Sequence, residues 1–460
     1  MPAGSLHGAH TERALESFPL SGLPVHAELA RAYGAVKLAC ARTNRQLGVW
    51  AGDDAKAEAI ERACRELADG SLDGHIVVDR LQGGAGASTN MNVNEVLANR
   101  ALQLLGETPG SYDRVSPAAD LDLHQSANDT YPTALRLATI GLLHGLEEQV
   151  VSLQETFRAK EQEYAHVVKV GRTQCQDTVL TTLGREMGAY AEALDRDRWR
   201  VHKCEERLRV VNLGGTAIGS GFAAPRQYVF RVVDVLRELS GIGFVRAENL
   251  TDATQNADVL VEVSGVLKTH AVTLLKIAGD LRLMSSGPDA GLGEIRLPRR
   301  QGGSAAVPGR IDPVIPEAVS QVALYVFGCD ATIAVAAGSG SLELNAFLPL
   351  VADRLLESLR LLAHADETLR RLCVEGLEAD EERCAAQVHA SAAAATALVP
   401  EIGDEAARDI AHRARERGAT VREVVLADGV LTADRYDELL TAEAVCRLGT
   451  PGMGSRGAQD

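Results

Sequence analysis

The chain has 460 residues and a mass of 48.8 kDa, and 46% of its residues are hydrophobic, which is enough for a large core. Aromatic residues are scarce at 4%, while Ala, Leu, Val, Glu and Arg dominate, and this composition favours packed helices. Lys plus Arg number 47 against 63 Asp plus Glu, so the net charge is −16. This balance argues against a surface that follows nucleic-acid phosphates or an anionic membrane.

Targeting and redox signals are absent from the sequence. There is no run of about 18 uncharged apolar residues, so no membrane span is expected. The first 18 residues lack the apolar stretch of a secretory signal. The eight cysteines are scattered singly without a Cys-x-x-Cys pair, so we expect no zinc cluster and no dithiol motif, but buried reduced thiols. These features predict a cytoplasmic protein.

Residues 1–138, 139–395 and 396–460 differ in pattern and are predicted to be three domains. The first mixes short helical stretches with glycine-rich loops, the second is a succession of long amphipathic helices, and the third holds several short helices. Long helices are expected near residues 183–211, 258–284, 316–337 and 342–362. The best candidate for a strand is residues 75–78. The pattern predicts a mainly α protein around a helical bundle, whose several apolar faces favour self-association.

Four polar or glycine-rich islands interrupt these helices. They are residues 83–95, 122–133, 171–178 and 287–317. None has the context of a dinucleotide-binding fold or of a phosphate-binding loop, and no zinc-protease or nucleophile-elbow motif occurs. Taken singly, an island of this kind indicates a turn more often than a site. The last island is the exception because loops of this length in compact proteins are commonly functional, and it carries a serine among glycines and small residues.

Six segments resemble, in chain order, the landmarks of the aspartase/fumarase superfamily of homotetrameric helical lyases. They are residues 82–101 (QGGAGASTNMNVNEVLANRA), 124–134 (HQSANDTYPTA), 171–178 (GRTQCQDT), 212–219 (NLGGTAIG), 303–317 (GSAAVPGRIDPVIPE) and 342–345 (LELN). The resemblance covers about residues 11–450 and is specific because all six segments keep the family's order. It implies a three-domain aspartase/fumarase fold in which the long-helix bundle forms part of a 20-helix core in a homotetramer.

The resemblance implies a β-elimination that releases fumarate from a small dicarboxylate, without cofactor or metal, at active sites shared by three subunits. Removal of a C3 proton beside a carboxylate requires that the resulting carbanion delocalise into a doubly charged aci-carboxylate. Ser304, on the long loop, falls on the family's base position. The residues that the resemblance assigns to the C4 carboxylate are Ser88, Thr89, Asn90, Ser126, Ala127 and Asn128. Thr173 and Arg310 are assigned to the C1 carboxylate.

The sequence departs from the family pattern where the leaving group would be handled. Ala87 and Ala127 stand in place of threonines, and Gln174 stands in place of a histidine, although Glu317, the histidine's usual partner, remains. An amide cannot shuttle a proton, and the lost hydroxyls make the pocket poorer for an ammonium group. Nitrite needs no proton to leave and accepts hydrogen bonds from amides such as those of Gln174 and Asn128. We therefore prefer nitrosuccinate, cleaved to fumarate and nitrous acid as in the nitrous-acid-supplying pathways of antibiotic biosynthesis, over aspartate.

The long loop carries three further departures. Arg310 replaces a lysine, Asp312 replaces an asparagine, and Ala305 replaces a serine. Arginine can hold a carboxylate with two hydrogen bonds, whereas Asp312 would either neutralise or orient Arg310 or repel the substrate. His124 stands where the family has serine, and a structural role is as compatible with the pattern as a substrate contact.

Three alternatives stay open from the sequence. The chain could be an aspartate ammonia-lyase or fumarase-type enzyme with an altered amine or water site. It could also be a catalytically inactive relative or a non-catalytic structural homotetramer.

Overall fold

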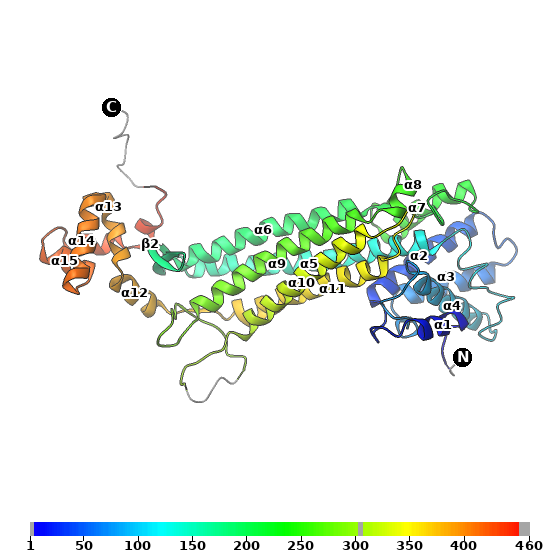
Figure 1. Cartoon of the computed structure of the whole chain (residues 1–460), viewed down its shortest axis with the longest axis horizontal. Coiled ribbons are helices and arrows are strands. Elements are labelled where there is room, and N and C mark those ends of the chain that lie inside the picture. The colour runs from blue at the N-terminus through cyan, green and yellow to red at the C-terminus, as the bar shows by residue number, and fades with distance from the viewer. Residues whose placement is uncertain (1–3, 302–306, 450–460) are drawn as a thin grey trace, which may run out of the picture. The chain divides into compact units, whose positions relative to one another are not determined.

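The structure is a computed structural model that describes residues 4–301 and 307–449, and it is mainly α-helical (Figure 1). The chain forms two compact units, each assembled from three separate stretches of sequence. Unit 1 contains residues 4–148, 198–271 and 322–363. Unit 2 contains residues 149–197, 272–301, 307–321 and 364–449.

The α-helices follow the long periodic stretches of the sequence. Their bounds are α1 Ala9–Ser17, α2 Ala27–Gln46, α3 Asp54–Ala68, α4 Ala87–Leu104, α5 Ala127–Glu163, α6 Leu183–Leu208, α7 Arg226–Ser240, α8 Leu250–Gln255, α9 Asp258–Met284, α10 Val314–Gly338, α11 Leu348–Leu369, α12 Glu381–Ala390, α13 Val399–Ile402, α14 Asp404–Arg417, α15 Val421–Ala427, α16 Ala433–Leu439 and α17 Ala442–Val445. Helices α5, α6, α9, α10 and α11 each contain residues of both units.

The strands are short and form two-stranded sheets. They are β1 Val168–Thr173, β2 Gln176–Thr182, β3 Val210–Val211, β4 Val245–Arg246, β5 Ile295–Arg296 and β6 Glu378–Ala379. The pairs β1–β2 and β5–β6 are antiparallel, and β3–β4 is parallel.

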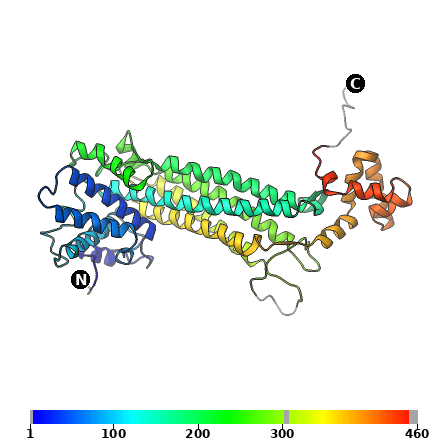
Figure 2. The same ribbon diagram turned by 180° about the vertical axis from the view of Figure 1, so that it is seen from behind.

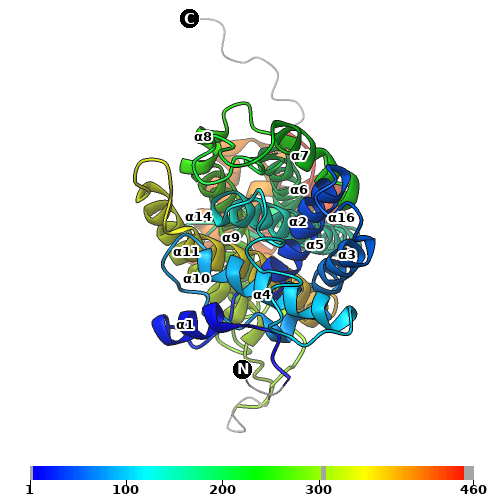
Figure 3. The ribbon, with the colours of Figure 1, turned by 90° about the vertical axis from the view of Figure 1, so that its right-hand side faces the viewer.

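In unit 1 the helices α2, α3 and α4 pack against one another, and α7 lies beside α2 (Figures 1 and 3). The α2–α3 contact is close because a Cβ atom at Gly34 would lie 2.4 Å from the backbone nitrogen of Ala68. Their shared core buries Tyr33, Val36 and Ile60 completely. This packing positions the start of α4, which carries part of the predicted site.

Side-chain contacts join the long helices within each unit. In unit 1, His144 on α5 lies 2.7 Å from Glu205 on α6, and Ser264 on α9 donates to Asp330 on α10. In unit 2, Gln154 on α5 donates to Asp195 on α6, Tyr190 on α6 donates to Asp280 on α9, and Arg282 on α9 lies 3.8 Å from Glu317 on α10. The helices beyond residue 390, orange to red in Figure 2, bury a separate apolar cluster that includes Leu398, Ile410 and Tyr436.

The predicted strand at residues 75–78 is wrong. Residues Asp73–His75 form a short 3₁₀ helix instead. The side chain of Asn92 accepts from the backbone of Val77 and Val78 and donates to the carbonyl of His75, so it takes the place of a partner strand. The longest strands of the described chain, residues 168–173 and 176–182, overlap the island at residues 171–178, which the sequence indicated only as a break between helices.

Helix α11 begins later than the sequence predicted. Leu342 has a positive φ of 52°, and Asn345 donates to the carbonyls of Ala336 and Ala337 at the end of α10. These contacts cap α10 and keep residues 341–347 in a turn, so α11 starts at Leu348.

Helix α10 is long and apolar enough, by length and composition, to cross a membrane, although no membrane span was expected from the sequence. Its most apolar window has a mean hydropathy of 1.5, and 33% of that window is buried. Leu324, Tyr325 and Val335 are exposed on it, while Asp330 in the same helix is paired with Lys268.

Seven of the cysteines are buried or partly buried, but Cys175 is exposed. The expectation of buried thiols is therefore wrong at Cys175, because this residue occupies the tip of a hairpin.

Candidate functional site

The starts of helices α4 and α5 lie in contact in unit 1. Gly86, which precedes α4, has a φ of +92°, and a Cβ atom there would lie 2.0 Å from the ring of Tyr131 on α5. The N-terminal turns carry backbone N–H groups without helical partners and a partial positive charge. Two such turns side by side can receive a carboxylate.

Two of the three side chains in the first predicted group, at the start of α4, are hydrogen-bonded within the fold. Thr89 is buried, and its backbone N–H and hydroxyl both donate to the side chain of Gln82 at 3.0 Å. Asn90 is 2% exposed, donates to Asp122 at 3.0 Å and accepts from Thr130 at 3.2 Å. Ser88 is half-buried, and its hydroxyl has no side-chain hydrogen bond among the described residues. Of these three side chains, Ser88 is the one left available to a ligand.

A buried lysine, which the sequence analysis missed, supports Asn90. The ammonium of Lys37 on α2 donates to the carbonyl of Leu121 and to the side chains of Asp122 and Gln125 at 2.9–3.3 Å. Burial raises the pKa of Asp122, but the charge of Lys37 and the hydrogen bond from Asn90 outweigh it, so the pKa lies below its ordinary value. Asp122 is therefore ionised and fixes the Asn90 amide.

The second predicted group, at the start of α5, is bound to the segment 212–219. Asn128 donates to the carbonyl of Ala217 at 2.8 Å, and Asn212 donates to the carbonyl of Asn128 at 3.0 Å. The amide nitrogen that we expected to reach the leaving group is thus already engaged. Ser126 and Ala127 are half-buried, and the Ser126 hydroxyl accepts from the N–H of Asn128.

Asp129, in the first turn of α5, is a second residue that sequence reasoning missed. One of its oxygens accepts from the N–H of Ser126, and the other accepts from the N–H groups of Gly214 and Thr216 at 3.0–3.1 Å. Complete burial raises its pKa to about 6 in spite of these donors. Asp129 therefore joins the start of α5 to the segment 212–219. Its place directly after Asn128 in the matched motif was the available signal.

His124 is held by the fold. Its Nδ1 lies 2.8 Å from the amide oxygen of Asn44, and its ring packs against Tyr228 at a centroid distance of 5.3 Å. Burial lowers the pKa of the imidazole. Of the two roles that the sequence left open, these contacts supply the structural one.

Thr173 and Gln174 lie at the tip of the β1–β2 hairpin in unit 2. Gln174 and Cys175 have φ angles of 54° and 61°, the combination of a two-residue type I′ turn. The hydroxyls of Thr173 and Thr178 lie 2.9 Å apart across the strands. Thr173 and Gln174 are both exposed, so the hairpin presents them away from its own core.

Ser304, the predicted base, lies outside the described residues. Arg310 is described, and its Nε donates to Asp312 at 2.7 Å. Both side chains are about two-fifths exposed, at 46% and 36%. Asp312 therefore pairs with Arg310, which is the first of the two roles considered for it.

The predicted residues thus fall into separate groups. Ser88, Thr89, Asn90, Ser126, Ala127 and Asn128 come together in unit 1. Thr173, Gln174, Arg310 and Asp312 belong to unit 2, and no hydrogen bond joins the hairpin pair to the loop pair among its described residues.

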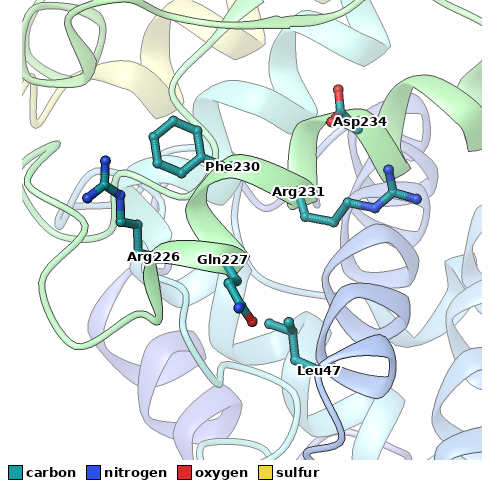
Figure 4. Close-up of a pocket in the computed structure, with 6 residues that line it drawn as sticks. All are labelled: Leu47, Arg226, Gln227, Phe230, Arg231 and Asp234. Carbon is teal, nitrogen blue, oxygen red and sulfur yellow. The ribbon is translucent and has the colours of Figure 1, made fainter.

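A cavity of about 750 Å³ lies elsewhere in unit 1, between the end of α2 and α7, and contains none of the predicted residues (Figure 4). Its charged side chains do not converge: Arg226 and Arg231 point to opposite sides in Figure 4. Arg226 lies over the ring of Phe230 at 5.4 Å, and Arg231 lies 3.4 Å from Glu238. We do not assign the site to this cavity because a small-ligand site needs a few convergent polar groups.

Comparison with known proteins gives the same assignment as the motifs. Residues 1–328 match the family described as Lyase, and residues 395–447 match the family described as Fumarase C C-terminus. The chain is 45% identical to an aspartate ammonia-lyase of Pseudomonas canavaninivorans over 96% of this chain and 94% of the relative. It is 40% identical to an aspartate ammonia-lyase of a Bacillus species over 98% and 96% of the two chains.

Among solved structures, the cobalt-bound fumarate lyase:delta crystallin from Brucella melitensis matches with a TM-score of 0.92 and 44% identity, over 97% of this chain and 96% of that one. The class II fumarase from Schistosoma mansoni matches with a TM-score of 0.87 and 29% identity, over 96% of each chain. The mainly helical fold expected from the sequence is therefore confirmed. The chain belongs to the aspartase/fumarase superfamily of lyase enzymes.

Proposed function

We propose that the protein is a carbon–nitrogen lyase that converts a C2-substituted succinate to fumarate by β-elimination. The observation that carries this proposal is the pair of helix starts at Ala87 and Ala127, held in contact by Gly86 and Tyr131. The backbone N–H groups of Ser88 and Ala127, which have no hydrogen-bond partner among the described residues, and the Ser88 and Ser126 hydroxyls form a cradle of donors for one carboxylate. These donors stabilise the aci-carboxylate better than the substrate carboxylate because the negative charge there grows as the C3 proton leaves.

The long loop supplies the remaining chemistry in this proposal. Ser304 takes the C3 proton, and Arg310 with Thr173 holds the second carboxylate. Asp312 already neutralises part of the Arg310 charge, so Arg310 holds a carboxylate more weakly than a free arginine would. The hydrogen bond from its Nε to Asp312 also orients the guanidinium. A homotetramer, with each active site shared by three subunits, brings the groups of unit 1 and unit 2 together from different chains.

Nitrosuccinate is the substrate that we propose. The residue that carries this choice is Gln174, an exposed amide at the hairpin tip in the place where the family resemblance expects a histidine. An amide donates a hydrogen bond to a nitrite oxygen but transfers no proton, and nitrite leaves without one. We assigned two side-chain amides, those of Asn128 and Gln174, to the leaving group. The Asn128 amide donates to the carbonyl of Ala217, so the Gln174 amide is the one still available.

Aspartate is the second candidate, and a specific observation supports it. The aspartate ammonia-lyases described above are 40% and 45% identical to this chain over nearly its whole length. Losing an ammonium group from aspartate needs acceptors, and Ala87 and Ala127 provide none. The two candidates therefore differ in the product that carries nitrogen, nitrite or ammonia.

The test is a parallel assay of the purified protein with nitrosuccinate, L-aspartate and malate. Fumarate is followed by its absorbance, and nitrite and ammonia are each measured separately. We expect fumarate and nitrite in equal amounts from nitrosuccinate. Fumarate and ammonia from aspartate, with no nitrite from nitrosuccinate, would establish the second candidate instead, and no turnover of any substrate would contradict the lyase proposal.

The base assignment has its own test. The Ser304→Ala variant should lose about 10²- to 10⁴-fold in kcat because general base catalysis contributes about that much. The control is Ser320→Ala, which removes a hydroxyl bound to the backbone of α10. Near-normal kcat in Ser304→Ala would show that another group removes the proton.

A further inference from the structure

A buried cluster of charges lies beneath the β1–β2 hairpin of unit 2. Glu294 is fully buried, and one of its oxygens accepts from Arg172 at 2.5 Å. Its other oxygen lies 2.8 Å from the ammonium of Lys169, close enough for an ion pair although the geometry makes no hydrogen bond. Lys169 also donates to both oxygens of Glu186 at 2.8 Å. Arg172 also lies 3.5 Å from Asp177 on β2, so two cations face three carboxylates.

The cluster connects two elements that are far apart in the sequence. Lys169 and Arg172 lie on β1, directly before Thr173 at the hairpin tip. Glu294 directly precedes β5, from which the chain continues into the long loop that carries Arg310. The Glu294 carboxylate therefore attaches β1, the strand that leads to Thr173 and Gln174, to the base of this loop.

Helix α12 holds the same base of the loop from a second side. Arg383 donates to the carbonyls of Asp289, Gly291 and Leu292. Gln387 donates to Leu292 at 2.6 Å and accepts from Arg172 at 3.1 Å. Hydrogen bonds from α12 therefore hold the backbone just before Glu294. The Glu294 side chain starts from this held backbone and can keep the hairpin in place.

We propose that Glu294 is a positioning residue, which acts through Arg172 and Lys169 to hold Thr173 and Gln174 in their working orientation. The proposal rests on the proposed lyase function for its kinetic consequence, but the effect on the hairpin does not depend on any substrate. A misplacement of about 1 Å at a site can cost about 10²-fold in rate, so a small rotation of β1 is sufficient for a large effect.

The test compares Glu294→Gln with a matched control, Glu61→Gln. Glu61 on α3 is also a buried carboxylate shared by several cations, namely Arg42, Arg45 and Arg65, but it lies in unit 1, whereas the hairpin lies in unit 2. Each variant is examined by hydrogen exchange of the hairpin amides at residues 168–182, by thermal unfolding and by steady-state kinetics on the substrate that the wild type turns over.

We expect the hairpin amides of Glu294→Gln to exchange about tenfold faster or more, and kcat to fall by about 10- to 100-fold. The control should unfold at a comparably lowered temperature with hairpin exchange and kcat unchanged. Thr173→Ala combined with Glu294→Gln should lose less kcat than the sum of the two single losses in free energy, because part of the Glu294 effect acts through Thr173. Glu294→Asp, which keeps the charge but shortens the side chain, should give intermediate exchange and provides a folded variant if Glu294→Gln does not fold.

Unchanged hairpin exchange in Glu294→Gln, or in Glu294→Asp where only that variant folds, would overturn the proposal. Additive losses in the double variant would do the same. If the wild type turns over none of the succinates, the lyase proposal fails, and the hydrogen exchange alone still decides the role of Glu294.

Discussion

At the scale of single residues, the side chains assigned to the substrate differ in how far the fold has already used them. Asn90 and Thr89 are buried and hydrogen-bonded to other side chains, whereas the half-buried Ser88 and the exposed Gln174 have no side-chain partner among the described residues. A side chain that is hydrogen-bonded to another buried group contributes mainly to the stability of the fold. A side chain without such a partner is available to bind a ligand.

This difference predicts opposite effects for two neighbouring substitutions. Asn90→Ala removes one hydrogen bond from the buried Asp122, which keeps Lys37, and one from Thr130, which keeps the Ser126 carbonyl, and should lower the free energy of unfolding by about 1–3 kcal/mol. Ser88→Ala should leave the unfolding free energy within about 0.5 kcal/mol of the wild type and raise KM for the dicarboxylate. Denaturant unfolding and steady-state kinetics on both variants check the pair, and equal stability losses would contradict the division.

The raised pKa of Asp129 gives a prediction for the pH dependence of stability. Its folded-state pKa of about 6 exceeds the ordinary value of 3.8, so between these pH values the folded protein binds more protons than the unfolded chain. The contribution of this group to stability is therefore fully present below pH 3.8 and is lost as pH rises through 6. Its full size is about 3 kcal/mol because one pKa unit corresponds to about 1.4 kcal/mol.

The measurement compares Asp129→Asn with the wild type in thermal unfolding from pH 4 to pH 8. The stability of the wild type relative to the variant should decrease between about pH 4 and pH 6 and stay constant above, since asparagine does not titrate. A difference that is independent of pH would show that the buried carboxylate titrates at its ordinary value.

At the scale of elements, the contact between the starts of α4 and α5 depends on a glycine. A side chain at Gly86 would have to occupy the space of the Tyr131 ring at a backbone φ of +92°, which residues with a Cβ atom adopt at a cost. The same contact sets the distance between the two groups of N–H donors. The packing and the proposed binding of a carboxylate therefore depend on one position.

Gly86→Ala should accordingly lower the free energy of unfolding by about 3 kcal/mol or more, from overpacking together with the unfavourable φ. The matched control is Gly83→Ala, where the new Cβ atom would meet the ring of Phe18 at an ordinary 3.6 Å. Denaturant unfolding of both variants measures the effect. Similar stabilities for the two would mean that the helix starts can separate without cost.

At the scale of the whole molecule, the apolar face of α10 matters most. Leu324, Tyr325 and Val335 are exposed on it, with Val335 at 72%, although the helix is among the most apolar of the chain. In the homotetramer that we propose, a second copy of the chain covers this face, which removes the apolar surface from water.

Replacing both Leu324 and Val335 by lysine should therefore shift the protein from tetramers to smaller species in sedimentation velocity. The double variant places two charges on the surface that the partner would bury. Leu448→Lys changes a leucine that is 99% exposed and serves as the control, which should remain tetrameric. Unchanged sedimentation of the double variant would place the subunit contact elsewhere.

The sequence was sufficient for the family, the helical class and the segments that hold the candidate residues. Each of those depends on local periodicity or on motifs that are contiguous in the chain. It was insufficient for the partners of those residues: Lys37 reaches Asp122 from 85 positions away, and Arg172 reaches Glu294 from 122 positions away. It also missed the hairpin at residues 168–182, because a type I′ turn formed by Gln174 and Cys175 lacks the usual asparagine and glycine.

The positive φ of Gln174 has a consequence for how this enzyme can change over generations. Histidine tolerates such a backbone angle better than most residues, so the hairpin can carry either residue without being rebuilt. The codons for glutamine and histidine differ at a single base. A lineage can therefore gain or lose a proton-transferring group at this tip in one mutational step, with the rest of the scaffold left as it is.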